Sequence, residues 1–324
     1  TFVVAFGRGV RGILEGGVIA AALIYFILVI GLIKQAWFRF SVVELKKMLS
    51  YGLPLVPAGL AAWILTMADR YFLQFLSTPE DLGLYSLGYK FGLPIQVLIV
   101  GPFQLAWAPF MFSIAKESHA REIYARVLTY FVLVSIFGAL ALSALSEELI
   151  AVMSTPSFHD AYKVVPLIAL SYVLYGCYFV FAVGINLEGK TKYVALLALC
   201  AAVLNLGLDY LLITDHGMMG AAVATVLSYL VLPIGSFFIS QRYYKVTYEW
   251  GRIVKILIAA AFIYTGSTCI ENGSAIVEGI LKTITLLGFP ILLLLFGFLE
   301  PKEAEKAREV IKALPRYVRQ RLEK

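Results

Sequence analysis

The chain contains nine separate apolar stretches of about 20 residues or more, and these constrain the fold more than any other feature. A helix rises about 1.5 Å per residue, so about 20 residues cross the roughly 30 Å hydrocarbon core of a bilayer. The third stretch is too long for one straight crossing, and Pro94, Pro102 and Pro109 give it places to bend. We predict spans at residues 13–33, 52–72, 83–112, 125–146, 163–186, 192–213, 218–240, 253–270 and 279–299.

The composition excludes a soluble protein. Of the 324 residues, 60% are hydrophobic and 15% are charged, against roughly 45–50% and about 25% in soluble domains. A soluble domain of this length still exposes about a quarter of the surface of its unfolded chain, so it could not hide so many apolar residues. The net charge of +6 comes from basic residues between apolar runs, which indicates membrane topology. We therefore expect contact with membrane lipids and no nucleic-acid partner.

The basic residues also predict the orientation. Cytoplasmic loops of membrane proteins carry an excess of Lys and Arg, and one alternating set of loops, with the C-terminal tail, holds 21 of the 27 basic residues. The other loops are mainly acidic, with Lys163 and Lys282 at their edges, while Arg8 and Arg11 disagree with the rule. We predict a multi-pass protein of the cytoplasmic (inner) membrane with a cytoplasmic C-terminus.

Two predicted cytoplasmic segments are amphipathic. Residues 41–50 place apolar side chains on one helical face, and residues 301–324 form a basic tail with a similar apolar face. Such helices lie at the level of the lipid headgroups, where anionic lipids attract the basic residues. We interpret both segments as membrane-surface anchors.

Few charged residues lie within the predicted spans, where they are costly and usually face the interior of the bundle. Lys90 lies about two turns into the third span, with Ser86 on its helical face and Tyr85 and Tyr89 beside it. This pattern predicts a cation among hydroxyl groups and rings that could bind an anionic substrate. The alternative is a lysine that reaches the interface or pairs with a carboxylate.

Asp69 and Arg70 stand at the predicted end of the second span, as interfacial anchors or at the mouth of a site. They also belong to a faint repeat: DRYFL at 69–73 and DYLLI at 209–213 are each followed by a polar turn and a glycine. Such repeats are expected in transporters that work between pseudo-symmetric halves. Asp209 is a weaker site candidate.

Several of these segments resemble polysaccharide flippases of the O-antigen, or Wzx-like, type, within the multidrug/oligosaccharidyl-lipid/polysaccharide exporter superfamily. The segments are YGLPLVPAGLAAWILTMADRYFLQFL (51–76), EDLGLYSLGYKFG (80–92), LAWAPFMF (105–112), INLEGKTKYV (185–194) and LNLGLDYLLITDHGMMGAAVATVLSYL (204–230). The resemblance implies an all-α polytopic transmembrane helix bundle. Family members carry 12 or 14 helices in two lobes around a cavity, and the nine spans here would match helices six to fourteen.

The resemblance also implies how the chain is organised. Residues 1–51 would hold the last helix of the first lobe and a linker, 52–240 a six-helix second lobe, 241–300 two additional helices, and 301–324 the tail. Helices one to five have no counterpart. Because the chain starts at Thr1 and nine spans place its ends on opposite faces, we expect it to be part of a longer protein.

Three functions are compatible with these observations. The leading one is export of polyprenyl-pyrophosphate-linked oligosaccharide, with a polysaccharide polymerase and glycosyltransferases as partners and with substrate contacts from Lys90, Arg70, Asp69, Tyr85, Ser86 and Tyr89. The runner-up is a drug or cation antiporter of the same superfamily, which would need carboxylates deep in the bundle. The third is a non-transporting membrane scaffold.

No enzyme motif is present in the sequence. There is no HExxH, GxSxG or phosphate-binding glycine loop, and the three histidines lie in separate loops. Cys177, Cys200 and Cys269 fall inside apolar stretches without metal-ligand spacing, so we interpret them as small buried hydrophobic residues. We expect no catalytic residue, no metal site and no cofactor.

Overall fold

The computed structural model describes residues 9–35, 41–53, 56–270, 275–299 and 303, and their regular elements are all helical. They fall into two compact units, residues Thr1–Leu55 and Val56–Lys324. The first unit holds α2 (Gly9–Gln35) and α3 (Val42–Gly52). The Ser41 side chain caps α3 by accepting a hydrogen bond from the Glu44 amide at 3.4 Å. The predicted amphipathic segment 41–50 is therefore helical, whereas the predicted tail helix lies outside the described residues.

The second unit begins with α4 (Val56–Leu76) and α5 (Pro79–Gly92), joined by a tight turn. Thr78 caps α5 by accepting from the Asp81 amide at 3.1 Å, and Pro79 occupies the first turn, where no backbone donor is needed. We call this side of the unit the turn end. In place of a simple proline bend, a π-helical turn η2 (Gln96–Val100) joins α5 to α6 (Gly101–Ile114).

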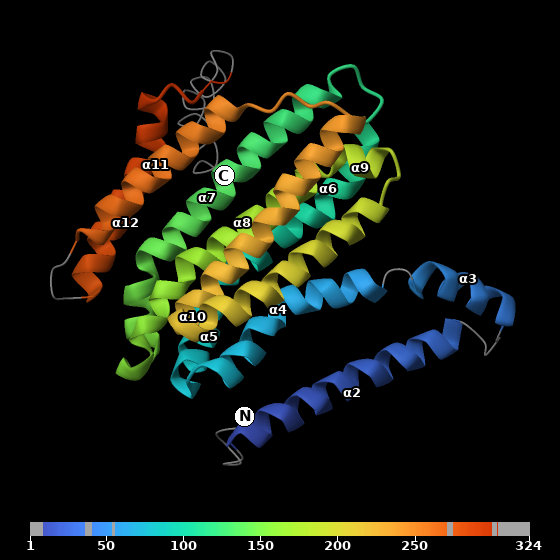
Figure 1. Ribbon diagram of the computed structural model, residues 1–324, viewed down its shortest axis with the longest axis horizontal. Coiled ribbons are helices and arrows are strands. Elements are labelled where there is room, and N and C mark those ends of the chain that lie inside the picture. Colours follow the sequence, from blue (N-terminus) through green and yellow to red (C-terminus); the bar gives the residue numbers. More distant parts are fainter. Residues whose placement is uncertain (1–8, 36–40, 54–55, 271–274, 300–302, 304–324) are drawn as a thin grey trace, which may run out of the picture. The chain divides into compact units, whose positions relative to one another are not determined.

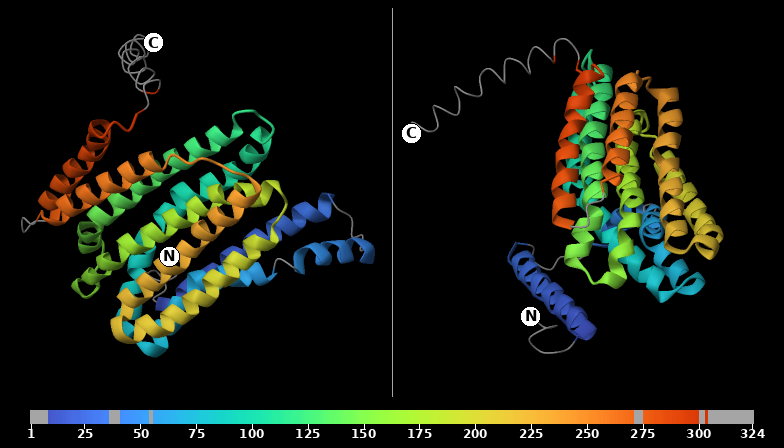
Figure 2. Two further views of the ribbon diagram at one scale, coloured as in Figure 1. Left: turned by 45° about the horizontal axis from the view of Figure 1, so that its top comes forward. Right: turned by 90° about the vertical axis from the view of Figure 1, so that its left-hand side faces the viewer.

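The centre of this unit is formed by helices that run side by side (Figures 1 and 2). They are α7 (Ala120–Met153), the 3-10 helix η3 (Pro156–Val164) that leads into α8 (Val165–Phe181), the short α9 (Val183–Leu187), and α10 (Lys192–Tyr243). Gly217 interrupts α10 with φ 50° and ψ −129°, a backbone conformation that favours glycine. The two predicted spans 192–213 and 218–240 are thus the two arms of α10.

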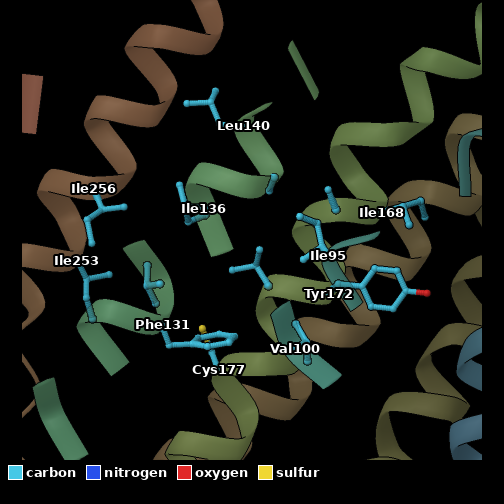
Figure 3. Close-up of a cluster of buried hydrophobic side chains, with 14 of the residues drawn as sticks. Ile95, Val100, Phe131, Ile136, Leu140, Ile168, Tyr172, Cys177, Ile253 and Ile256 are labelled. Atoms are coloured by element: carbon cyan, nitrogen blue, oxygen red, sulfur yellow. The ribbon is translucent and has the colours of Figure 1, made fainter. Parts of the chain in front are cut away.

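Close contact between α7 and α8 depends on Gly176. A side chain added there would overlap the ring of Phe131, so the absence of a Cβ lets the two helices approach. Figure 3 shows part of the apolar core around this contact, with Tyr172 at its edge and the hydroxyl group turned away from the cluster. The labelled residues are Ile95, Val100, Phe131, Ile136, Leu140, Ile168, Tyr172, Cys177, Ile253 and Ile256.

The last two described helices, α11 (Trp250–Thr268) and α12 (Ala275–Leu295), pack on α7. Lys282 of α12 is 5% exposed and pairs with Glu148 of α7, with Glu147 3.4 Å away. At the first turn of α11, Arg252 pairs with Glu249 at 3.0 Å and with Glu303 at 2.8 Å. Because buried charges are costly unless they are paired, the Lys282 pair holds α12 against α7. Thr129 and Tyr130 of α7 donate hydrogen bonds to Glu249 and Glu303, which connects the Arg252 cluster to the same helix.

The predicted fold class is confirmed. Each of the nine predicted stretches lies mainly in helix, and in the described part of the chain five helical stretches are long and apolar enough to cross a membrane. These are Pro79–Ile114, Ala120–Met153, Pro156–Phe181, Lys192–Tyr243 and Val277–Leu295, and Glu15–Gly31 is a shorter apolar stretch. The protein is a multi-pass, all-α membrane protein.

Two details differ from the sequence prediction. Cys177 is buried, but Cys200 and Cys269 are exposed, because the outer face of a membrane helix is itself apolar and can carry such residues. In addition, α4 runs to Leu76, so Asp69 and Arg70 lie about two turns inside the helix rather than at its end. The charge of Asp69 does not end the helix because neighbouring helices supply it with hydrogen-bond partners.

Candidate functional site

A buried polar cluster surrounds Asp69. Its carboxylate accepts hydrogen bonds from Asn205 Nδ2 at 3.2 Å, from Thr225 Oγ1 at 3.0 Å and from the hydroxyl group of Tyr85. The four side chains come from α4, α5 and both arms of α10, and Asp69, Tyr85 and Asn205 are completely buried. Charge-assisted hydrogen bonds of this kind are the strong ones in proteins. They explain how a carboxylate is accommodated inside an apolar bundle.

A second carboxyl group joins this cluster. Asp209 is also completely buried, and its carboxyl group lies close enough to that of Asp69 for their negative charges to repel each other. Neither Asp209 oxygen has a donor among the described residues, and Asn205 Oδ1 also lacks one. Two buried carboxyl groups near each other repel when both are charged, and a proton or a cation bound between them removes this repulsion. This cluster of oxygen atoms can therefore bind a proton or a small cation.

A cavity of about 580 Å³ lies next to the acidic pair. Arg70, Tyr89 and Lys90 line it, together with Gln96 and the tyrosines of α8 and α10. The guanidinium group of Arg70 lies 4.3 Å from the ring centroid of Tyr89, a cation–π contact, and donates to the Thr66 carbonyl at 2.7 Å. The cavity thus carries two basic side chains against a wall of tyrosine rings.

The structure distributes the six predicted site residues over three environments. Lys90, Arg70 and Tyr89 line the cavity, and Lys90 is exposed, with no ion pair to any described residue. Asp69 and Tyr85 lie behind the cavity wall in the polar cluster. Ser86 is half-buried and is not part of the cavity lining. Two adjacent residues of α4 therefore have different surroundings: Asp69 lies in the polar cluster, and Arg70 lines the cavity.

Sequence reasoning missed several residues of this region. Asn205 and Thr225 hold Asp69 in place, and Gln96, Tyr172, Tyr175, Tyr178 and Tyr229 line the cavity. The spacing of four between Asn205 and Asp209 puts both on one helical face, and this was the available signal. The tyrosines of α8 gave no signal, because aromatic residues are common on every face of a membrane helix.

The described helices form a multi-pass membrane bundle with a cavity lined by basic and tyrosine side chains. Residues 2–115 match the family model described as "Polysaccharide biosynthesis protein". The structure is similar to that of the lipid II flippase MurJ in an inward closed conformation, with a TM-score of 0.65 and 16% sequence identity. The similarity covers 89% of this chain and 62% of the flippase, so this chain spans less than two thirds of its length. No curated protein matches the sequence significantly.

These two findings bear out the resemblance to polysaccharide flippases that the sequence motifs indicate. At 16% identity the structural match shows the fold alone, and the family model covers only the first third of the chain.

Proposed function

We propose that the full-length protein is a flippase that moves polyprenyl-pyrophosphate-linked oligosaccharides across the cytoplasmic membrane. The products would be lipopolysaccharide, capsule or exopolysaccharide, with a polymerase and glycosyltransferases as partners. The single observation that carries the proposal is the cavity in which Arg70 and Lys90 stand among tyrosine rings. A pyrophosphate that leaves water needs fixed donors and positive charge in exchange for its hydration shell. Lysine acts as a point-charge partner, and arginine can bind phosphate in bidentate fashion.

The pair of buried aspartates suggests that transport is coupled to the movement of an ion. Ionisable residues inside a membrane protein usually mark ion or proton pathways. Asp69 and Asp209 are completely buried, and Asp69 directly precedes Arg70, which lines the cavity. Binding of a proton or Na⁺ at this pair would change the charge beside Arg70, its neighbour on α4. In the proposed orientation the turn end faces outward and the C-terminus is cytoplasmic, as the basic loops predict.

A drug or cation antiporter remains the second candidate, and the structure removes the sequence-based reason against it. That reason was the position of the acidic residues near the ends of the spans, whereas Asp69 and Asp209 are buried together. A coupled flippase and an antiporter would both use the pair. They differ in the cargo, because two basic side chains repel a cationic drug and attract a pyrophosphate.

Binding to the purified full-length protein in detergent separates these functions. The probes are undecaprenyl pyrophosphate, uncharged undecaprenol and the cationic dye ethidium. A flippase should bind the pyrophosphate lipid at least tenfold more tightly than undecaprenol, and Lys90→Ala should remove most of this preference. The matched control is Lys163→Ala, which removes a lysine outside the cavity lining. Preferential binding of ethidium would favour the antiporter, and binding of none of the probes would favour the scaffold.

A further inference from the structure

The π-helical turn η2 places Gln96 in the cavity lining, and the proposed pyrophosphate site does not involve this residue. The amide of Gly101 donates to the Gln96 carbonyl five residues earlier, which widens the helix by one residue. Single π-helical turns inside α-helices occur frequently at functional sites. Ile95 and Val100, at either end of the turn, are buried in the apolar core (Figure 3). The turn is therefore held firmly from behind, while Gln96 lines the cavity.

Gln96 presents an unused acceptor at this position. Its Oε1 atom is buried and has no hydrogen-bond partner among the described residues. A buried acceptor without a donor is unfavourable, so such atoms are usually satisfied by a ligand, by water or by another side chain. Because Gln96 lies in the lining of the cavity, a molecule that enters the cavity can supply the missing donor.

Five tyrosine rings of the cavity lining contact one another in a series. Tyr89 contacts Tyr172 with centroids 6.0 Å apart, Tyr172 contacts Tyr229 at 6.5 Å, and Tyr229 contacts Tyr175 at 5.7 Å. Tyr175 is stacked with Tyr178 at 6.1 Å. All five tyrosines line the same cavity. Aromatic faces pack well against the C–H faces of sugar rings, and they need no charge on the sugar.

The cavity therefore has two chemically different parts. Lys90 and Gln96 are six residues apart, or about 9 Å along a helix axis, and the charge is confined to Lys90 and its neighbour Arg70 in the lining. The other lining residues are uncharged, and their polar groups include the amide of Gln96 and the hydroxyl groups of the tyrosines. A ligand with an anionic group and a neutral hydroxyl-bearing ring fits this division.

We propose that Gln96 determines specificity for the sugar next to the pyrophosphate, by accepting a hydrogen bond from a sugar hydroxyl or acetamido N–H group. Tyr175 and Tyr229 form the ring wall of this neutral sugar subsite. The inference rests on the proposed flippase function. It assigns residues to the sugar of the substrate, which the basic residues do not recognise. A site that offers a hydrogen bond to a substrate group rejects analogues that lack the group more strongly than an apolar pocket can.

The test compares lipid probes with and without sugar on the full-length protein. The probes are undecaprenyl pyrophosphate and its N-acetylglucosamine and galactose derivatives. Gln96→Met keeps the length of the side chain and removes the amide, and Leu98→Ala is the matched control, because Leu98 lies on the same turn and is 72% exposed. Gln96→Met should weaken binding of at least one sugar-bearing lipid about tenfold and leave binding of undecaprenyl pyrophosphate unchanged. Leu98→Ala should change neither.

Each alternative result has a distinct meaning. If Gln96→Met binds every sugar-bearing lipid as tightly as the unmodified protein does, the sugar subsite is refuted while the flippase proposal stands. If the unmodified protein binds no pyrophosphate lipid at all, the proposed function fails and the subsite fails with it. Unchanged binding of undecaprenyl pyrophosphate also shows that the Gln96→Met variant is folded.

Discussion

The carboxyl groups of Asp69 and Asp209 are buried close to each other, although the two residues are 140 positions apart in the sequence. They are the corresponding aspartates of the faint repeat formed by residues 69–73 and 209–213. The two copies meet at this point, with Asn205 and Thr225 completing the cluster around Asp69. The repeat thus provides a paired acidic site that neither copy could form alone.

The acidic pair should bind a cation. For the purified full-length protein, replacing KCl by NaCl should raise the midpoint of thermal unfolding, because a ligand that binds only the folded state adds about 2.7 kcal/mol at 100 times its Kd. Asp209→Asn should abolish the effect, and the control Asp215→Asn, on an exposed residue of α10, should retain it. If Na⁺ has no effect and transport depends on a pH gradient instead, the ion is a proton. Insensitivity of transport to both ions would refute the coupling role.

Lys90 should be essential for export by the full-length protein. Lys90→Ala should abolish polysaccharide export at normal protein levels, while Lys90→Arg retains part of it because the positive charge remains. Export is measured by immunoblotting of surface polysaccharide, with membrane protein levels determined in parallel. Normal export by a well-expressed Lys90→Ala variant would contradict this prediction. It would favour the alternative, in which the Lys90 side chain extends to the membrane interface.

Lys282 should contribute strongly to stability. Lys282→Met leaves Glu148, which is 7% exposed, as a buried unpaired charge, and we expect a loss of about 3–5 kcal/mol in the free energy of unfolding. The double variant Lys282→Met/Glu148→Gln should recover most of this loss. Lys163→Met is the control, since its pair with Asp160 is exposed and should contribute about 1 kcal/mol or less. Equal losses for the two lysine variants in denaturant unfolding would contradict the prediction.

The contact between α7 and α8 should be sensitive to size. Gly176→Ala places a methyl group against the Phe131 ring, and we expect a loss of about 1–3 kcal/mol from overpacking. Phe131→Leu in the same chain should restore part of it by making room. The measurement is denaturant unfolding of the single and double variants, and additive losses would show that the two residues do not share the contact.

The membrane topology can be tested directly. Reporter fusions after Asp215 and after Arg242 should lie on opposite sides of the membrane, because the second arm of α10 separates these positions. An alkaline phosphatase fusion after Asp215 should be active and one after Arg242 inactive. Matching signals at both positions would show that this arm does not cross the membrane, and a reversed pattern would invert the proposed orientation.

The sequence by itself determined where the helices are, because a chain within a bilayer must satisfy its backbone hydrogen bonds internally and long apolar runs do this as helices. It also singled out Lys90, Arg70 and both aspartates, since charged residues are conspicuous inside apolar segments. Which helix faces meet was decided only by the tertiary structure. Inward and outward faces of membrane helices are almost equally apolar, and close packing of small residues selects between them.

The consequences are visible at particular residues. Asp69 and Arg70 are neighbours on the same helix, yet Asp69 faces Asp209 and Arg70 faces the cavity. The reason is that Asn205 and Thr225, from another helix, donate hydrogen bonds to Asp69. In the sequence, Gln96 is one polar residue within an apolar run and was not among the predicted site residues. Its role depends on a π-helical turn that two buried neighbours hold in place, and on tyrosines contributed by helices distant in sequence. Such a cavity depends on side chains from several helices, so local sequence patterns could not predict it.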